Sequence, residues 1–184
     1  PMKVQVIYSS LSGRTRKVAE AIYADLPAEE KELLDLKDGE PTLDGDVILF
    51  GYWVDKGGPN AAMKELLPKV EGKAVGVFCT LGFYADSEHA RKSLLAGVEL
   101  LREKNTVLGG YVCNGALSES IISRFRQAGT SGPHSATPEN EIRWEVMKDH
   151  PTEAELALAA ERFKERVEIY RAFREKGLAF KSVL

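Results

Sequence analysis

Short apolar runs rich in β-branched residues alternate with longer amphipathic segments over the first 115 residues of the chain. The apolar runs predict five strands, at residues 3–8, 31–35, 46–50, 74–79 and 107–113. The amphipathic segments predict helices at residues 16–26, 60–67 and 87–104. Strands that alternate with helices are typical of a parallel sheet covered on both faces. We therefore expect an α/β fold, a three-layer αβα sandwich around a doubly wound, five-stranded parallel sheet.

The pattern changes after residue 115. Residues 119–127 predict a short helix, residues 128–140 are rich in Gly, Ser, Thr and Pro and predict a loop, and residues 152–176 predict a long amphipathic helix. The apolar stripe of this last helix is expected to close the sheet. We expect a single domain over residues 2–184, with core βα units at 2–115, an irregular insertion at 116–151 and a C-terminal helix at 152–176.

Composition narrows the class of protein. The chain has 184 residues, of which 43% are hydrophobic and 29% charged, and these values are ordinary for a globular protein. The net charge of −3 gives no support to a nucleic-acid or anionic-membrane partner. The sequence has no apolar run of membrane-spanning length and no basic-then-apolar leader, so we expect a cytoplasmic protein.

Two cysteines, Cys79 and Cys113, each end an apolar run. If their strands are neighbours, the two thiols could form a redox pair. The simpler interpretation is that both are small buried hydrophobic residues in a reducing compartment, and we favour it.

The strongest candidate for chemistry is the turn that follows the first predicted strand. Ser10, Ser12 and Thr15 supply hydroxyl groups, Gly13 allows a close backbone approach, Arg14 adds positive charge, and the turn contains no acidic residue. The turn also precedes a helix, whose N-terminal N–H groups and dipole favour an anion. The pattern indicates a phosphate-binding loop, although a Ser-rich helix cap would look similar.

Aromatic residues follow the third and fourth predicted strands. One loop, residues 51–58, contains Tyr52 and Trp53; the other, residues 80–86, contains Phe83 and Tyr84. Because the carboxyl ends of parallel strands meet at one edge of a sheet, these rings are expected near the phosphate-binding loop. A planar ligand that carries a phosphate would suit this arrangement.

The chain resembles the flavodoxins from residue 4 to about residue 115. Residues 10–15 match the family's phosphate loop, Thr/Ser-x-Thr-Gly-x-Thr, with Arg14 where Asn is common; the family's Gly-Asp is missing, since Phe83 follows Gly82. The resemblance implies the strand order 2-1-3-4-5 and the cofactor FMN, with its ring between Trp53 and one aromatic residue of the Phe83–Tyr84 pair. The implied cofactor-binding residues are Ser10, Leu11, Ser12, Gly13, Arg14, Thr15, Tyr52, Trp53, Val54, Asp55, Gly57, Thr80, Leu81, Gly82, Phe83 and Tyr84.

Other classes with related patterns fit poorly. A response-regulator receiver needs acidic residues after its first and third strands, where this chain has Ser9-Ser10 and Gly51-Tyr52. A low-molecular-weight phosphatase needs an Arg six residues after its Cys, and neither cysteine has one. No Walker or dinucleotide glycine motif follows a strand, and the three histidines lack ligand spacing, so no metal is expected.

The main functional hypothesis is an FMN-dependent electron carrier that delivers electrons to a redox partner protein and has no catalytic residues of its own. One alternative is an NAD(P)H-dependent FMN or quinone reductase. Its phosphate contacts would come from the insertion: Arg124, Arg126, His134 or Arg143. Another alternative is a flavin-binding partner subunit of a reductase. Within the flavin hypothesis, the Gly57–Gly58 peptide could reorient when the flavin is reduced, or could simply form a tight turn.

Overall fold

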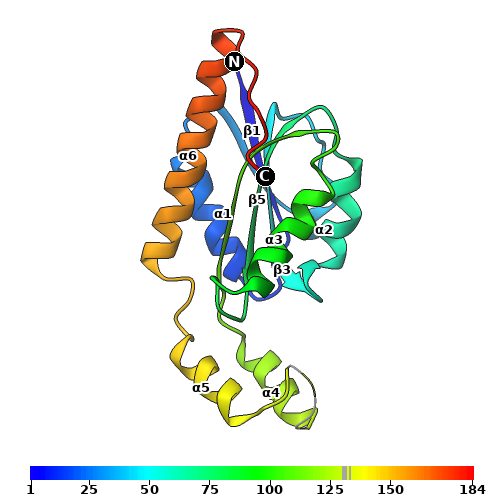
Figure 1. The fold of residues 1–184 in the computed structure, drawn as a ribbon, viewed down its shortest axis with the longest axis vertical. Coiled ribbons are helices and arrows are strands. Elements are labelled where there is room, and N and C mark those ends of the chain that lie inside the picture. Colours follow the sequence, from blue (N-terminus) through cyan, green and yellow to red (C-terminus); the bar gives the residue numbers. More distant parts are fainter. Residues whose placement is uncertain (130–131, 133) are drawn as a thin grey trace.

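A parallel sheet forms the centre of the molecule in the computed structural model, which describes residues 1–129, 132 and 134–184 (Figure 1). The strand order is β2-β1-β3-β5-β6, and the additional short strand β4 pairs antiparallel with β3. Because β4 was not predicted, β5 and β6 are the fourth and fifth predicted strands, and the order is the expected doubly wound order 2-1-3-4-5. The strands are β1 (Lys3–Tyr8), β2 (Glu30–Asp35), β3 (Val47–Asp55), β4 (Gly58–Pro59), β5 (Ala74–Leu81) and β6 (Thr106–Asn114).

Helices cover both faces of this sheet. On one face α1 and α6 pack against each other and the strands; α2 and α3 cover the other face. Within the described residues, the α-helices are α1 (Arg14–Asp25), α2 (Ala61–Leu66), α3 (Glu88–Glu99), α4 (Glu119–Gln127), α5 (Pro138–Val146) and α6 (Glu153–Glu175), with short 3₁₀ turns at Leu36–Asp38 and Leu67–Lys69. The expected three-layer sandwich is therefore confirmed. None of the helices formed by the described residues has the length and hydrophobicity needed to span a membrane.

The core depends on glycines that let large rings approach the sheet. A Cβ atom at Gly51 would lie 2.1 Å from the ring of Phe78, so no side chain fits there. Phe78 packs against Phe163 of α6 with ring centroids 6.1 Å apart, and both rings are fully buried. The stripe predicted on the last helix thus closes the sheet, as expected.

Strand β3 is longer than the sequence pattern predicts. It continues past Phe50 to Asp55, because Tyr52 and Trp53 pair with Cys79 and Thr80 of β5. Tyr52 and Trp53 therefore belong to a strand and not to a loop, and alternation along the strand sends their side chains to opposite faces.

Residues 116–150, which make up nearly all of the predicted insertion at 116–151 and which we call the lobe, project beyond the carboxyl ends of the strands (Figure 1). The lobe contains α4, as expected, and also α5, which the prediction of a loop at residues 128–140 missed. Helix α5 has a regular start: Thr137 Oγ1 accepts a hydrogen bond from the Asn140 N–H, and Pro138 occupies the first turn. Residues 130, 131 and 133 of the predicted loop lie outside the described residues.

The two cysteines lie on neighbouring strands but on opposite faces of the sheet. Cys79 belongs to the core under α2 and α3, and Cys113 belongs to the core under α1 and α6. Both are free and buried, and burial raises the pKa of the Cys79 thiol to about 12. This placement supports the buried-hydrophobe interpretation over a redox pair.

Candidate functional site

The predicted phosphate loop lies between β1 and α1. The Ser10 hydroxyl oxygen accepts hydrogen bonds from the backbone N–H groups of Gly13, at 3.1 Å, and Arg16, at 3.3 Å, and so holds the turn together. Gly13 is left-handed, with φ 90°, and no atom lies within 4 Å of the position that a Cβ would take. The first helical turn starts at Arg14, so N–H groups without partners inside the helix gather at this loop.

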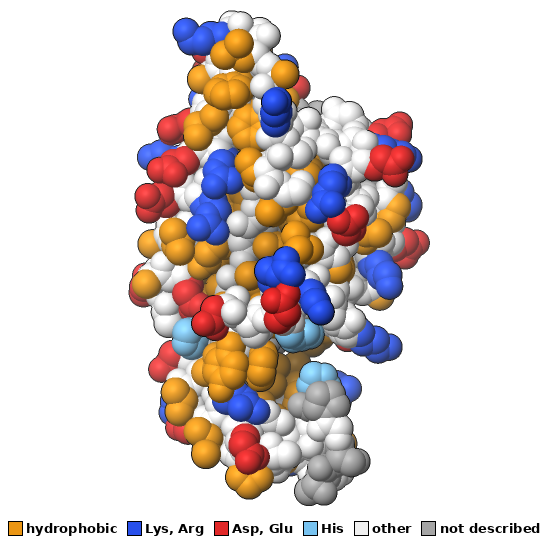
Figure 2. All heavy atoms as spheres, viewed as in Figure 1, with side chains coloured by type: hydrophobic (Ala, Val, Ile, Leu, Met, Phe, Trp, Pro, Cys, Tyr) orange, Lys and Arg blue, Asp and Glu red, His pale blue; other side chains and the backbone are white. Residues whose placement is uncertain are grey.

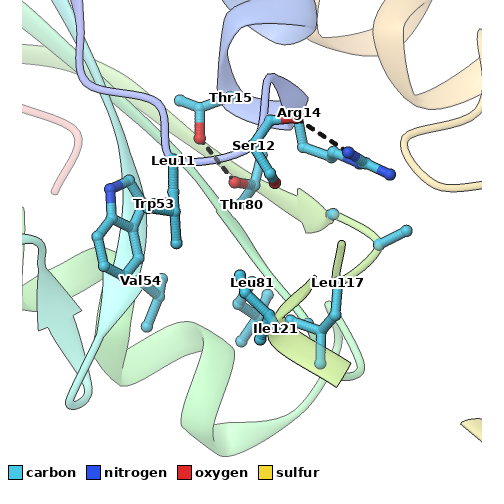
Figure 3. A pocket seen from close by; sticks show the side chains of 13 residues that line it. Leu11, Ser12, Arg14, Thr15, Trp53, Val54, Thr80, Leu81, Leu117 and Ile121 are labelled. Carbon is cyan, nitrogen blue, oxygen red and sulfur yellow. Dashed lines mark hydrogen bonds between the residues drawn. The ribbon is translucent and has the colours of Figure 1, made fainter. Parts of the chain in front are cut away.

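Two contacts connect the loop to its surroundings. The Arg14 guanidinium donates to the Ser12 carbonyl oxygen at 2.9 Å, which keeps the positive charge beside the loop. The hydroxyls of Thr15 and Thr80 lie 2.8 Å apart and are buried, which links the start of α1 to the end of β5 (Figure 3). The structure thus brings candidate residues from the phosphate loop, α1 and β5 together.

A shallow pocket opens beside the loop, and its empty space, open solvent at the mouth included, amounts to about 370 Å³. Hydroxyl groups and Arg14 lie at one end, and apolar side chains lie at the other (Figure 3). The lining residues are Leu11, Ser12, Arg14, Thr15, Trp53, Val54, Thr80, Leu81, Gly82, Gly115, Ala116, Leu117 and Ile121. Arg14 is the ionisable residue among them.

The candidate aromatic residues do not converge on this pocket. Trp53 lines it, whereas Phe83 and Tyr84 pack against each other, 4.6 Å between ring centroids, and beneath Arg143 of α5. The Arg143 guanidinium lies 5.4 Å and 5.7 Å from their centroids. Neither Phe83 nor Tyr84 lines the pocket, and the placement of a ligand ring between Trp53 and this pair stays a prediction.

The remaining candidates from β3 lie away from the pocket, except for Val54. Tyr52 is fully buried, its hydroxyl donates to the Ser93 carbonyl oxygen at 2.7 Å, and burial raises its pKa. Asp55 ends β3, and Lys56 and Gly57 form the hairpin turn to β4 with φ values of 51° and 78°. Positive φ at both central residues is the geometry of a tight two-residue hairpin. Reorientation of the Gly57–Gly58 peptide stays a prediction.

Residues that follow β6 also line the pocket, although they are not among the predicted cofactor-binding residues. Gly115, Ala116, Leu117 and Ile121 all line the pocket. These residues could have been predicted from the sequence. Strand β6 ends at the same edge of the sheet as β3 and β5, so the loop that follows it is also expected at the ligand-binding edge.

Asn114, the last residue of β6, fixes the neighbouring loop. Its side-chain amide donates to the carbonyl oxygens of Leu81, at 3.3 Å, and Phe83, at 2.8 Å. Its Oδ1 atom is buried and has no hydrogen-bond partner among the described residues. Asn114 therefore sets the course of the chain after β5.

The residues proposed as contacts for a nicotinamide cofactor are engaged elsewhere or exposed. Arg126 makes a bidentate ion pair with Glu141, and His134 stacks on Phe125 with centroids 5.0 Å apart. Arg124 is exposed on α4. Among residues 1–129, 132 and 134–184, no three His, Cys, Asp or Glu side chains are grouped in a way that could hold a metal ion.

A doubly wound sheet with a hydroxyl-rich loop between β1 and α1 defines a class of ligand-binding α/β proteins. The chain belongs to the flavodoxin domain family, whose model matches residues 5–164. The flavodoxin-like domain-containing protein BilS of Clostridioides difficile (strain CD3) is 28% identical over 160 residues, which cover 84% of this chain and 90% of that protein. BilS of Clostridium symbiosum (strain WAL-14163) is 22% identical over 174 residues, 85% of this chain and 91% of that one.

Solved structures share the fold at low identity. A flavodoxin from the domain Archaea superimposes with a TM-score of 0.59 and 17% identity, covering 92% of this chain and 99% of that chain. A flavone reductase superimposes with a TM-score of 0.62 and 12% identity, covering 97% of this chain and 66% of that chain. The expected family resemblance and fold class are thus confirmed.

Proposed function

We propose that this protein binds FMN in the pocket beside α1 and carries electrons to a redox partner protein. One observation carries the proposal: a single pocket joins the hydroxyl-rich loop and Arg14 at one end to Trp53 and aliphatic side chains at the other. A ligand with a phosphate group and a planar apolar ring matches both ends. Membership of the flavodoxin domain family supports the same ligand.

The residues present fit an FMN phosphate. The helix N-terminus and the hydroxyl groups supply donors, Arg14 supplies positive charge, and residues 9–15 include no acidic side chain to repel an anion. Ser10, Ser12, Gly13, Arg14 and Thr15 would hold the phosphate. Open space beside Gly13 leaves room for the close approach of an anion to the backbone.

The apolar end of the pocket would orient the ring and exclude water. Trp53 offers an aromatic face there. When bound, FMN supplies the electron-transfer chemistry, and the surrounding side chains adjust its reduction potential. Burial in an apolar site disfavours extra negative charge. This end of the pocket would therefore lower the reduction potential for forming the anionic, reduced state of FMN.

The lining of the pocket favours a carrier over a reductase. Among the lining residues that the structure describes there is no carboxylate, histidine or tyrosine, so the pocket offers none of these side chains to exchange a proton with a bound quinone. The electron acceptor in the proposal is therefore another protein. Two free, buried cysteines suit a reducing compartment, so we place the carrier in the cytoplasm.

Titration of the apoprotein with FMN and, separately, with riboflavin tests the proposal, with flavin fluorescence as the signal. Arg14→Gln should weaken FMN binding about tenfold, because it removes a charged partner of the phosphate, and should leave riboflavin binding unchanged. Arg102→Gln, at an exposed arginine near the end of α3, is the matched control. Failure of the wild-type protein to bind FMN would contradict the proposal. Steady NADH or NADPH oxidation with a quinone would instead indicate a reductase.

A further inference from the structure

We propose that the lobe supplies the second wall of the flavin pocket, with the aliphatic side chains of Leu117 and Ile121 in place of a second aromatic ring. This inference rests on the proposed binding of FMN. In this arrangement, Trp53 of β3 would contact one face of the flavin ring, and residues at the start of α4 would contact the other face. The Phe83–Tyr84 pair has a different role: it holds α5.

Leu117 lies across the pocket from Trp53. In Figure 3, Trp53 and Val54 form one side, and Leu117 and Ile121 stand on the opposite side at the base of α4. Leu117 is half-buried and packs directly on Gly82, where a Cβ atom would come within 2.6 Å of the Leu117 side chain. Leu117 therefore occupies the space above the chain after β5, where an aromatic side chain was expected.

The position of Ile121 follows from the start of α4. The Ser118 hydroxyl oxygen accepts a hydrogen bond from the Ile121 N–H at 3.3 Å and caps the helix. Leu117 precedes this cap, and contacts between residues on either side of an N-cap fix the direction in which a helix leaves its loop. Ile122, the buried residue of α4, anchors the helix.

Contacts near the start of the lobe join it to its own end and hold the preceding residue, Gly115, against α1 and β5. The Ala116 N–H donates to the His150 carbonyl oxygen at 2.9 Å, which joins the start of the lobe to its end. At Gly115, a Cβ atom would lie 3.0 Å from Thr80 Cβ and 3.2 Å from Arg14 Cβ. The chain that leads into α4 thus runs directly over the phosphate loop and the end of β5.

The Phe83–Tyr84 pair is committed to the lobe. Besides lying over both rings, the Arg143 guanidinium donates to the Tyr84 hydroxyl at 3.4 Å. The Asn114 bond to the Phe83 carbonyl oxygen keeps this segment turned toward α5. Stacking Phe83 or Tyr84 on a ligand in the pocket would require its contact with Arg143 to break.

The test compares FMN dissociation constants, measured by flavin fluorescence, for Leu117→Ala, Tyr84→Leu and Leu158→Ala. Leu117→Ala should weaken binding about tenfold, because it removes apolar contact with the ring. Tyr84→Leu should change affinity less than threefold, within roughly 0.7 kcal/mol. Leu158→Ala, at a Leu that is 46% exposed on α6, is the matched control and should have no effect. Circular dichroism confirms that each variant is folded.

A second measurement needs no variant. Amide hydrogen exchange in a peptide spanning residues 117–127 should slow when FMN is added, whereas exchange in the second half of α6 should not change. Both results together support the lobe as a wall. FMN binding that is unaffected by Leu117→Ala, or a larger loss for Tyr84→Leu than for Leu117→Ala, would overturn the inference and leave the proposed function intact. Absence of FMN binding to the wild-type protein would overturn both.

Discussion

The lobe and the rest of the molecule, residues 1–115 and 151–184, which we call the body, are stabilised in different ways. In the body, every residue of β5 is buried, and large side chains such as Phe50, Phe78 and Phe163 are completely enclosed. In the lobe, Ile122 is the one buried residue of α4 and α5 has none. Hydrophobic side chains appear on the surface of the lobe and where it meets the body (Figure 2); Ile142 is 65% exposed and Val146 is 75% exposed.

Contacts at the surface hold the lobe together. Arg126 pairs with Glu141 across the two helices, and Phe125 packs against both His134 and Trp144, with centroid distances of 5.0 Å and 6.0 Å. Surface ion pairs and partly exposed rings stabilise far less than an enclosed core does. We infer that the lobe can open locally while the body stays folded, and this suits a wall beside a ligand pocket.

The largest effect is expected in the core of the body. Phe163→Ala should lower the free energy of unfolding by about 3–5 kcal/mol, because the cavity beside Phe78 and Gly76 is closed on all sides. Urea unfolding followed by circular dichroism measures it. Ile169→Ala, at an Ile that is 42% exposed on the same helix, is the control. A loss below 1 kcal/mol for Phe163→Ala would remove the contrast with the lobe.

Shortening a side chain in the lobe should destabilise the lobe without destabilising the body. Trp144 is half-buried against Phe125, so Trp144→Ala should destabilise the lobe by about 2 kcal/mol and speed proteolytic cleavage within residues 116–150. The urea midpoint of the body should stay unchanged. Ile142→Ala, on the exposed side of α5, serves as the control. A fall in the midpoint as large as that of Phe163→Ala would show that the two regions unfold together.

The phosphate loop lies at the boundary between the two regions. Ser10→Ala removes the acceptor of two backbone N–H groups and should cost about 1 kcal/mol of global stability, as well as weakening FMN binding. The Ser12 hydroxyl has no hydrogen-bond partner among the described residues, so Ser12→Ala should leave stability unchanged. Equal losses of stability for both variants would contradict the role given to Ser10.

The smallest effect concerns the ion pair of the lobe. The hydrogen bond from Arg126 lowers the pKa of Glu141 below its usual value near 4.5. The pair therefore stabilises the lobe at neutral pH, and this contribution is lost as the pH falls below 4.5 through the lowered pKa of the folded state. In NMR spectra, the Trp144 indole N–H signal should titrate in that range, and Glu141→Gln should abolish the titration. Glu145→Gln, on the same helix, should preserve it.

Local patterns predicted the body well because its elements carry strong signals. Alternation of apolar residues located the strands, and the Ser-x-Ser-Gly-Arg-Thr stretch located the loop at the start of α1. The end of β3 was misjudged, because Gly51 resembles a strand terminator in isolation. Its real role is to admit the ring of Phe78, and pairing with β5 carries the strand on to Asp55.

Helix α5 was missed for a different reason. Thr137 and Pro138 are ordinary helix-start residues, but they follow a stretch rich in Gly and Ser that favours a loop. Short helices are marginal without tertiary contacts, so local sequence is a weak guide to them. Contacts of Arg143 and Trp144 with residues from other segments stabilise this helix in the folded chain.

The amino-acid sequence by itself determined the layered fold and the chemistry at the start of α1, because strand periodicity, helix capping and hydroxyl content act over a few neighbouring residues. Only the tertiary structure decided which side chains face Trp53. That choice depends on where Asn114 directs the chain after β5 and on how Leu117 packs over Gly82, and these contacts join segments about 30 residues apart in the chain.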